Sequence, residues 1–176
     1  MKTITNFKSI FSFETERLLF KKIESNDLNH LIHMDTDSTV MNTLGGVRSA
    51  AQTAEGLQSN LNHWQEHGFG AWMVYLKQTD EWIGRSALRH VIVDGKNEIE
   101  VAYALLPTFW NQGLATEIAK ACIEIAFSAM QFEQIICFTS TTNKASQRVM
   151  EKAGFQYERD IMHAGLPHVL YRIKLK

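Results

Sequence analysis

Two glutamates at a spacing of two, Glu98 and Glu100, lie in a stretch of alternating residues that is typical of a strand. Side chains at that spacing point to the same face of a strand, so both carboxylates would face one region of the protein. A carboxylate in such a place can take a proton from an ammonium group, directly or through a bound water, and release a nucleophilic amine. A solvated antiparallel strand would show the same pattern, so both interpretations stay open at this point.

The segment 110–116, Trp-Asn-Gln-Gly-Leu-Ala-Thr, follows this strand and opens a predicted helix. Small residues at Gly113 and Ala115 expose several backbone N–H groups, and such donors at a helix N-terminus favour an anion such as a pyrophosphate. The hydroxyl of Thr116 adds one more donor. The segment is neither the Gly-x-Gly-x-x-Gly of a dinucleotide fold nor a P-loop, and alone it also fits an ordinary turn.

A second polar segment, residues 143–155, predicts a helix that starts with Asn143 and Ser146 and ends at Gly154. Both polar residues are common helix caps. Taken with the earlier segments, however, the chain resembles the GNAT superfamily of acetyl-CoA-dependent N-acetyltransferases. That superfamily has a loop of the form (Arg/Gln)-x-x-Gly-x-(Gly/Ala), followed by an Asn-x-x-Ser helix that ends in Lys-x-Gly-Phe.

Within the superfamily, the chain looks like the branch that contains the ribosomal-protein serine and alanine N-acetyltransferases. Residues 14–20 resemble the opening strand of that branch, and residues 98–103 resemble its central strand. The resemblance runs from about residue 13 to residue 172. Trp110 stands where the wider superfamily has Arg or Gln. Trp is common there in the branch, and its presence removes one possible cationic contact to phosphate.

The resemblance implies a set of contacts to acetyl-CoA. The strand that ends at Leu106 is expected to splay from its parallel neighbour, so that backbone groups of Ala104, Leu105 and Leu106 bind the pantetheine arm. The pyrophosphate is expected on the backbone of the next loop, at Gln112, Gly113, Leu114, Ala115 and Thr116. Asn143 and Ser146 are expected to reach the pantetheine and the sulfur. The Ser146 hydroxyl would help the thiolate to leave, a task for which the family often uses a Tyr that this helix lacks.

The expected function is that of an acetyl-CoA-dependent N-acetyltransferase that moves acetyl to a primary amine by direct attack, without a metal. Glu100, nearer the reacting end, is expected as the base ahead of Glu98 or a water. Cys122 and Cys137 lie in apolar periodic runs and are predicted to be buried hydrophobes rather than nucleophiles. The acceptor stays open between a protein N-terminus, a polyamine, an antibiotic and another small amine. The alternative is a non-catalytic acyl-CoA-binding sensor or partner-binding module.

The elements that position these residues follow from hydrophobic periodicity. Strands are predicted at 13–23, 71–77, 82–93, 98–106, 134–140, 155–164 and 168–174, and helices at about 26–34, 51–67, from 114 onward and at 144–153. Asp94-Gly95 predicts a hairpin. The polar stretch 35–49 is predicted to be a loop that, with the last hairpin, determines the acceptor. On the helix from residue 114, Glu117, Lys120 and Glu124 are predicted to lie on the outer face and pair with one another.

The expected fold class is therefore α/β (α+β): a mixed, largely antiparallel sheet with a splayed parallel strand pair, flanked by helices, like the GNAT acyl-CoA N-acyltransferase fold. A single domain, 1–176 with a core of about 13–172, suits a chain of 176 residues. A net charge of −1 argues against nucleic acid or an anionic membrane as partner. No signal peptide or membrane span is predicted, and a cytoplasmic monomer or homodimer is expected. His63 and His67 have a spacing that can bind a metal, but no third ligand accompanies them, so no metal site is expected.

Overall fold

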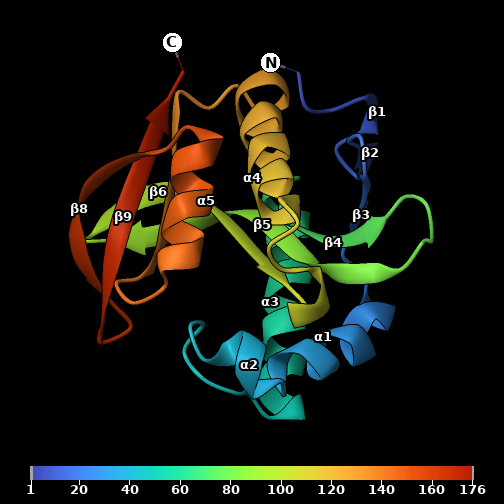
Figure 1. Cartoon of the computed structure of the whole chain (residues 1–176), viewed down its shortest axis with the longest axis horizontal. Coiled ribbons are helices and arrows are strands. Elements are labelled where there is room, and N and C mark those ends of the chain that lie inside the picture. The colour runs from blue at the N-terminus through green and yellow to red at the C-terminus, as the bar shows by residue number, and fades with distance from the viewer. Residues whose placement is uncertain (1, 176) are drawn as a thin grey trace.

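The computed structural model describes residues 2–175 and contains one mixed sheet flanked by helices (Figure 1). The sheet runs in the order β1-β2-β3-β4-β5-β6-β7-β9-β8. Its strands are β1 (Asn6–Ser9), β2 (Ser12–Glu14), β3 (Leu18–Lys22), β4 (Ala71–Leu76), β5 (Trp82–Val93), β6 (Lys96–Leu105), β7 (Gln134–Ser140), β8 (Gln156–His163) and β9 (Leu166–Lys174). Neighbouring strands are antiparallel except β6 and β7, which are parallel. The predicted fold class is confirmed.

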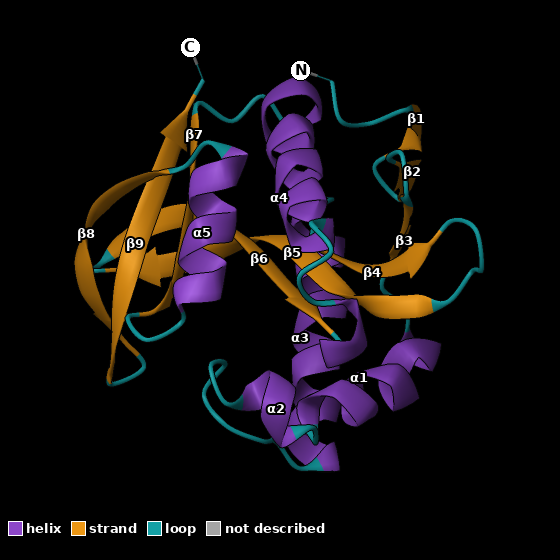
Figure 2. Cartoon of the chain, viewed as in Figure 1, coloured by secondary structure: helices purple, strands orange, loops and turns teal. Residues whose placement is uncertain are grey.

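The helices are α1 (Leu28–Asp35), α2 (Ser38–Met41), α3 (Ala50–His67), α4 (Leu114–Glu124) and α5 (Lys144–Ala153), and a π-helical turn, Ile125–Ala129, continues α4. α4 and α5 lie side by side over one face of the sheet, and α3 lies behind it in the same view (Figure 2). No described helix combines the length and the apolar character that crossing a membrane requires.

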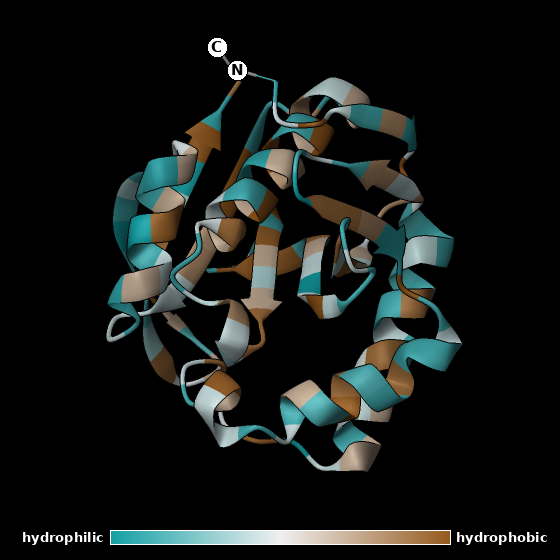
Figure 3. Ribbon diagram, turned by 45° about the vertical axis from the view of Figure 1, so that its right-hand side comes forward, coloured by the Kyte–Doolittle hydropathy of each residue, from teal (hydrophilic) through white to brown (hydrophobic). Residues whose placement is uncertain are grey.

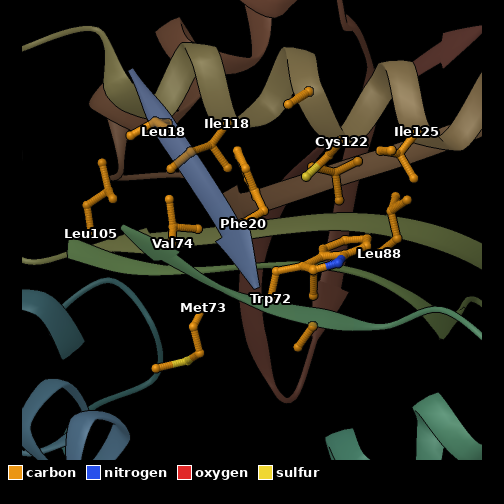
Figure 4. Close-up of a cluster of buried hydrophobic side chains, with 14 of the residues drawn as sticks. Leu18, Phe20, Trp72, Met73, Val74, Leu88, Leu105, Ile118, Cys122 and Ile125 are labelled. Carbon is orange, nitrogen blue, oxygen red and sulfur yellow. The ribbon is translucent and has the colours of Figure 1, made fainter. Parts of the chain in front are cut away.

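The main core lies between α4 and the sheet. Figure 4 shows side chains of α4 facing those of β3, β4 and β6, with Leu18, Phe20, Val74, Leu105, Ile118, Cys122 and Ile125 among them. The hydrophobic residues, brown in Figure 3, accordingly concentrate in the central strands and on the inner sides of the helices. Cys122 and Cys137 are buried free thiols, as predicted.

The prediction of one strand over residues 13–23 was wrong. β2 and β3 are separate antiparallel strands, with Phe13 opposite Phe20. The Thr15 N–H donates to Leu18 O at 2.9 Å, and the Leu18 N–H donates to Thr15 Oγ1 at 3.2 Å. A threonine side chain thus closes this turn without the Gly or Pro that would have marked it in the sequence.

The predicted loop 35–49 contains a short helix, α2. Its N-cap is Asp37, whose carboxylate accepts from the backbone N–H groups of Thr39 and Val40. Asp35, at the end of α1, is buried and pairs with both Arg48 and Arg85, at 3.4 Å and 3.0 Å. Because Arg85 belongs to β5, these ion pairs fix the stretch 35–49 against the sheet.

β5 and β6 lie very close together at Gly84. A Cβ atom at this position would lie 2.2 Å from Ala104 O and 2.9 Å from Leu105 Cα. Both neighbours are backbone atoms and cannot rotate away, so only a glycine fits. The close approach fixes the position of β6 near its carboxyl end.

We predict that Gly84→Ala lowers the free energy of unfolding by about 2–3 kcal/mol, because β6 must shift to admit the methyl group. Gly56→Ala, in the interior of α3 with nothing within 4 Å of the new Cβ, is the matched control. It should raise stability by about 0.5–1 kcal/mol, since alanine favours the helix. Chemical denaturation of both variants checks this, and equal stabilities would contradict the close approach.

Candidate functional site

The parallel strands β6 and β7 diverge after a single point of pairing. Within these two fully described strands, only Glu100 and Ile136 form a register pair. The edge of β6 that faces β7 beyond this point, residues 101–105, is called here the open edge. Since a backbone without a partner strand retains free donors and acceptors, this edge can bind an extended polar chain.

The alternation of β6 decides which backbone groups the open edge offers. The Leu106 N–H donates to Ile83 O at 2.9 Å, so the backbone groups of Ala104, two residues earlier, also face β5. Those of Tyr103 and Leu105 face the opposite way, and Leu105 O accepts from Trp110 Nε1 at 2.8 Å. Of the predicted positions, Leu105 therefore lies on the open edge, whereas Ala104 and Leu106 point toward β5.

The 110–116 loop connects the open edge to α4. Gly113, the N-cap of α4, has a φ of +76°, in the left-handed region that favours glycine. Asn111 has a φ of +60°, a conformation that asparagine tolerates better than most residues. Within residues 2–175, no protein group accepts a hydrogen bond from the backbone N–H groups of residues 112–116. The loop thus presents a row of free donors at the positive end of a helix.

A half-buried carboxylate in the first turn of α4 fixes this loop to the N-terminal strands. Glu117 accepts from Thr15 Oγ1 at 2.6 Å, from the Arg17 N–H at 3.0 Å and from Arg17 Nε at 2.7 Å. We call these three hydrogen bonds the Glu117 clamp. Arg17 Nη1 also donates to Gln112 O at 2.9 Å. A guanidinium therefore lies against the loop even though Trp110 occupies its first position.

The Glu117 clamp also sets the ionisation of its carboxyl group. Burial raises the pKa of Glu117, but the hydrogen bonds from Thr15 and Arg17 and the charge of Arg17 outweigh burial, and the pKa lies below its ordinary value. The predicted pairing of Glu117 with Lys120 and Glu124 was wrong. Glu124 instead accepts from the backbone N–H groups of Thr3 and Ile4, at 2.7 Å and 3.1 Å.

Glu98 and Glu100 share a face of β6, as their spacing predicted, and each is ion-paired. Glu100 is 3% exposed, and its Oε2 accepts from Arg89 Nε at 2.7 Å. The negative charge of Glu100 raises the pKa of Arg89. Glu98 accepts two hydrogen bonds from Arg172, both at 2.8 Å. Both oxygens of Glu98 are thus engaged, whereas Glu100 keeps Oε1 for another partner.

Asn143 and Ser146 lie at the start of α5, on the other side of the open edge. Asn143 is the N-cap, because its Oδ1 accepts from the Ser146 N–H at 3.0 Å. Its Nδ2 donates to Thr43 Oγ1 at 3.1 Å, which connects α5 to the residues after α2. The Ser146 hydroxyl lies 3.0 Å from the hydroxyl of Tyr103, a residue of β6 that the sequence analysis did not assign to the site.

Three rings from adjacent strands lie near Glu100. The ring centroids of His163 and His168 are 4.6 Å and 5.7 Å from that of Phe138, which shares the face of Glu100 because it lies two residues after Ile136. Burial lowers the pKa of His163, although the charge of Glu100 acts in the opposite direction. At neutral pH the His163 ring is therefore largely uncharged.

His63 is held by hydrogen bonds to backbone groups. Its Nδ1 lies 2.8 Å from Phe69 O, and its Nε2 accepts from the His90 N–H at 3.1 Å. Across the described chain, no group of three or more His, Cys, Asp or Glu residues is arranged to hold a metal ion. Burial raises the pKa of Cys122 to about 12, so this thiol is not a nucleophile near neutral pH.

Comparison with known proteins shows what this arrangement is similar to. The family model of the acetyltransferase (GNAT) domain matches residues 17–156. Of the curated proteins, "uncharacterized N-acetyltransferase YoaA" of Bacillus subtilis is 27% identical over 82% of both chains. An acetyltransferase of the GNAT family from Bacillus anthracis superimposes with a TM-score of 0.76 at 26% identity, over 93% of this chain and 98% of that one. The ribosomal L7/L12 alpha-N-protein acetyltransferase RimL, solved with coenzyme A, gives a TM-score of 0.76 at 16% identity, over 92% and 96%.

We predict that Glu117→Gln lowers the free energy of unfolding by about 1–3 kcal/mol at pH 7, because hydrogen bonds to a charged carboxylate are lost. The pKa of Glu117 is lower in the folded protein, so its stabilisation is present above the unfolded pKa of roughly 4.3 and is lost as the pH falls through the folded value. Chemical denaturation of the parent protein and of Glu117→Gln at several pH values from neutral to acid measures both free energies of unfolding. The difference between them should decrease as the pH falls.

Glu16→Gln is the control, because Glu16 lies exposed in the same turn of the chain. It should leave the stability within about 0.5 kcal/mol of the parent protein. Equal effects of the two substitutions would mean that the Glu117 clamp contributes no stability.

Proposed function

This chain belongs to the acetyltransferase (GNAT) domain family, and we propose that it transfers the acetyl group of acetyl-CoA directly to a primary amine. The observation that carries the proposal is the open edge of β6. A row of free N–H groups lies at one end of it, in the 110–116 loop, and Glu100 and Ser146 flank it on opposite faces of the sheet. An extended thioester substrate needs this combination, since its charged end and its reacting end lie far apart.

The 110–116 loop suits the pyrophosphate of acetyl-CoA. The backbone N–H groups of Gln112, Gly113, Leu114, Ala115 and Thr116 are the proposed donors, and the Thr116 hydroxyl adds another. Arg17 brings a positive charge to the same loop. RimL, which has the same fold, was solved with coenzyme A, which supports this assignment.

The pantetheine arm would then extend along the open edge. The backbone of Leu105, with that of Tyr103 beside it, faces the required direction, and Ala104 and Leu106 border the same path. Asn143 and Ser146 are proposed to contact the arm and the sulfur from the start of α5. Because these groups are backbone amides and hydroxyls, they recognise the amide-rich arm without a charged side chain.

The reaction needs a proton acceptor on the face of the incoming amine. We assign this role to Glu100, directly or through a water, because Arg89 occupies only Oε2. The freed amine attacks the thioester carbonyl carbon, the carbon–sulfur bond breaks, and the Ser146 hydroxyl donates a hydrogen bond to the departing thiolate. Glu98 is the weaker candidate for the base, since Arg172 engages both of its oxygens.

The proposed acceptor is a primary amine of a protein N-terminus or of a small molecule. RimL is an acetyltransferase of the ribosomal protein L7/L12, so peptides come first in a panel of acceptors to be tested. Polyamines and amine antibiotics belong in the same panel. The ion pairing of both Glu98 and Glu100 also fits a protein that binds acyl-CoA without turnover. Binding of acetyl-CoA with no release of thiol across the whole panel would favour this sensor.

We predict that saturating acetyl-CoA raises the melting temperature by about 5–10 °C, because binding to the native state at a hundredfold excess over Kd adds about 2.7 kcal/mol. Gly113→Val should weaken this shift strongly, since valine resists a φ of +76°. Only Arg17 Nη2, at 3.7 Å, would lie near the new Cβ, so the effect comes from the backbone rather than from a clash.

Gly95→Val is the matched control, because Gly95 has a φ of +75° and lies in the hairpin between β5 and β6. It should lower the melting temperature like Gly113→Val but keep the full shift with acetyl-CoA. An undiminished shift in Gly113→Val would remove the 110–116 loop from the cofactor site.

We predict that Glu100→Gln lowers kcat about 10²- to 10⁴-fold and leaves the Kd for acetyl-CoA nearly unchanged, because the amide keeps the shape but cannot accept the proton. The deficit should shrink as the pH rises toward the pKa of the acceptor amine, where free amine needs no base. Steady-state kinetics from pH 6 to pH 10, about four units, test this.

Glu98→Gln is the companion variant. It breaks the ion pair with Arg172. It should lower the melting temperature and leave kcat close to that of the parent protein. A pH-independent deficit in Glu100→Gln would indicate a structural role for Glu100, and a larger loss of kcat in Glu98→Gln would transfer the role of base to Glu98.

A further inference from the structure

The hydroxyl of Tyr103 joins the open edge of β6 to α5. Its oxygen lies 3.0 Å from Ser146 Oγ and 3.4 Å from Ser146 O. Tyr103 is three residues from Glu100 on the same strand, so its side chain occupies the face opposite the proposed base. The hydroxyl pair therefore lies on the side of the sheet that α4 and α5 cover.

Tyr103 remains a neutral phenol. Burial raises its pKa well above the ordinary value, and the neighbouring Cys137 raises it further. Burial raises the pKa of Cys137 in the same way, so this thiol also keeps its proton. At neutral pH, Tyr103 thus has one hydrogen to donate and faces no neighbouring thiolate that would take it.

Two arrangements of this hydroxyl pair are possible, and they differ in what Ser146 can do. If Ser146 donates to Tyr103, the serine hydrogen is used inside the protein. If Tyr103 donates to Ser146 Oγ, the serine hydrogen is free to point elsewhere. The two hydroxyl oxygens lie 3.0 Å apart and either can donate; in the second arrangement the phenol hydrogen takes this contact in place of the longer, 3.4 Å contact to the Ser146 carbonyl. A hydroxyl that accepts one hydrogen bond is also polarised into a better donor.

We propose that Tyr103 is a positioning residue for the departure of the thiolate: its phenol donates to Ser146 Oγ, so that the Ser146 hydroxyl hydrogen points at the sulfur of the leaving coenzyme A. The inference rests on the proposed function.

During acetyl transfer, Tyr103 and Ser146 both keep their hydroxyl protons. The bond between the amine nitrogen and the carbonyl carbon forms, and the bond between that carbon and sulfur breaks. The electron pair leaves with the sulfur, whose negative charge accepts the Ser146 hydrogen bond. Glu100 or its water takes the ammonium proton before the attack and passes it to solvent, and it then takes the second proton that the nitrogen loses as the amide forms. The thiolate takes a proton from solvent after release.

Tyr103→Phe should lower kcat about 3- to 10-fold, the range that corresponds to one hydrogen bond, and leave the Kd for acetyl-CoA nearly unchanged. Because Tyr103 acts through Ser146, the double variant Tyr103→Phe/Ser146→Ala should be no slower than Ser146→Ala alone. Tyr171→Phe is the matched control. It removes a 3.1 Å hydrogen bond from the phenol to Glu151, near the end of α5. This variant should keep the full kcat.

A binding measurement tests the same idea without turnover. Free coenzyme A should bind more tightly than desulfo-coenzyme A as the pH approaches the pKa of the thiol, because the site stabilises a thiolate. This preference should decrease in Tyr103→Phe and in Ser146→Ala, and persist in Tyr171→Phe. Full kcat in Tyr103→Phe, additive losses in the double variant, or an unchanged preference for the thiolate would each overturn the inference. Absence of turnover in the parent protein would instead count against the proposed function.

Discussion

The arrangement of the site depends on one break in hydrogen bonding, the divergence of β6 from β7 after Glu100 and Ile136. A parallel ladder that stops inside a sheet leaves backbone donors and acceptors without partners, which is costly unless other groups or a ligand satisfy them. The protein satisfies part of this demand itself, because Trp110 donates to Leu105 O. On the other side of β6, the close approach at Gly84 leaves no room for a side chain between β5 and the carboxyl end of β6.

Each of the three glutamates around this edge is paired with an arginine. Glu98 and Glu100 pair with Arg172 and Arg89 on one face, and Glu117 pairs with Arg17 beside the 110–116 loop. Buried carboxylates need such partners, because removing an ion from water without one is strongly unfavourable. Among the acceptors of these ion pairs, Glu100 Oε1 has no hydrogen-bond donor in the described residues, and the backbone N–H groups of the loop have no acceptor there. In the proposed function, Glu100 Oε1 therefore lies where the amine would react, and the N–H groups of the loop lie where the pyrophosphate would bind.

Local patterns in the sequence were sufficient for much of the fold. Alternation placed Glu98 and Glu100 on one face, and Asp94-Gly95 identified the hairpin of β5 and β6, because both signals act between near neighbours. The sequence did not predict the turn at Thr15 or the Glu117 clamp. The first closes through a threonine hydroxyl, and the second joins residues about 100 positions apart. The contact of Tyr103 with Ser146 was missed for the same reason, since only the packing of α5 against β6 brings the two hydroxyls together.

Gly84 bears on how variation in this protein should be interpreted. A side chain of any kind at that position collides with backbone atoms of β6, so natural selection for folding alone would keep the glycine unchanged. Its position beside the open edge would make such invariance look like evidence for a part in the reaction. Yet Gly84 offers neither a proton, a charge nor a hydroxyl. Constancy at this position would therefore record how closely two strands lie, and it would carry no information about the acceptor or the chemistry.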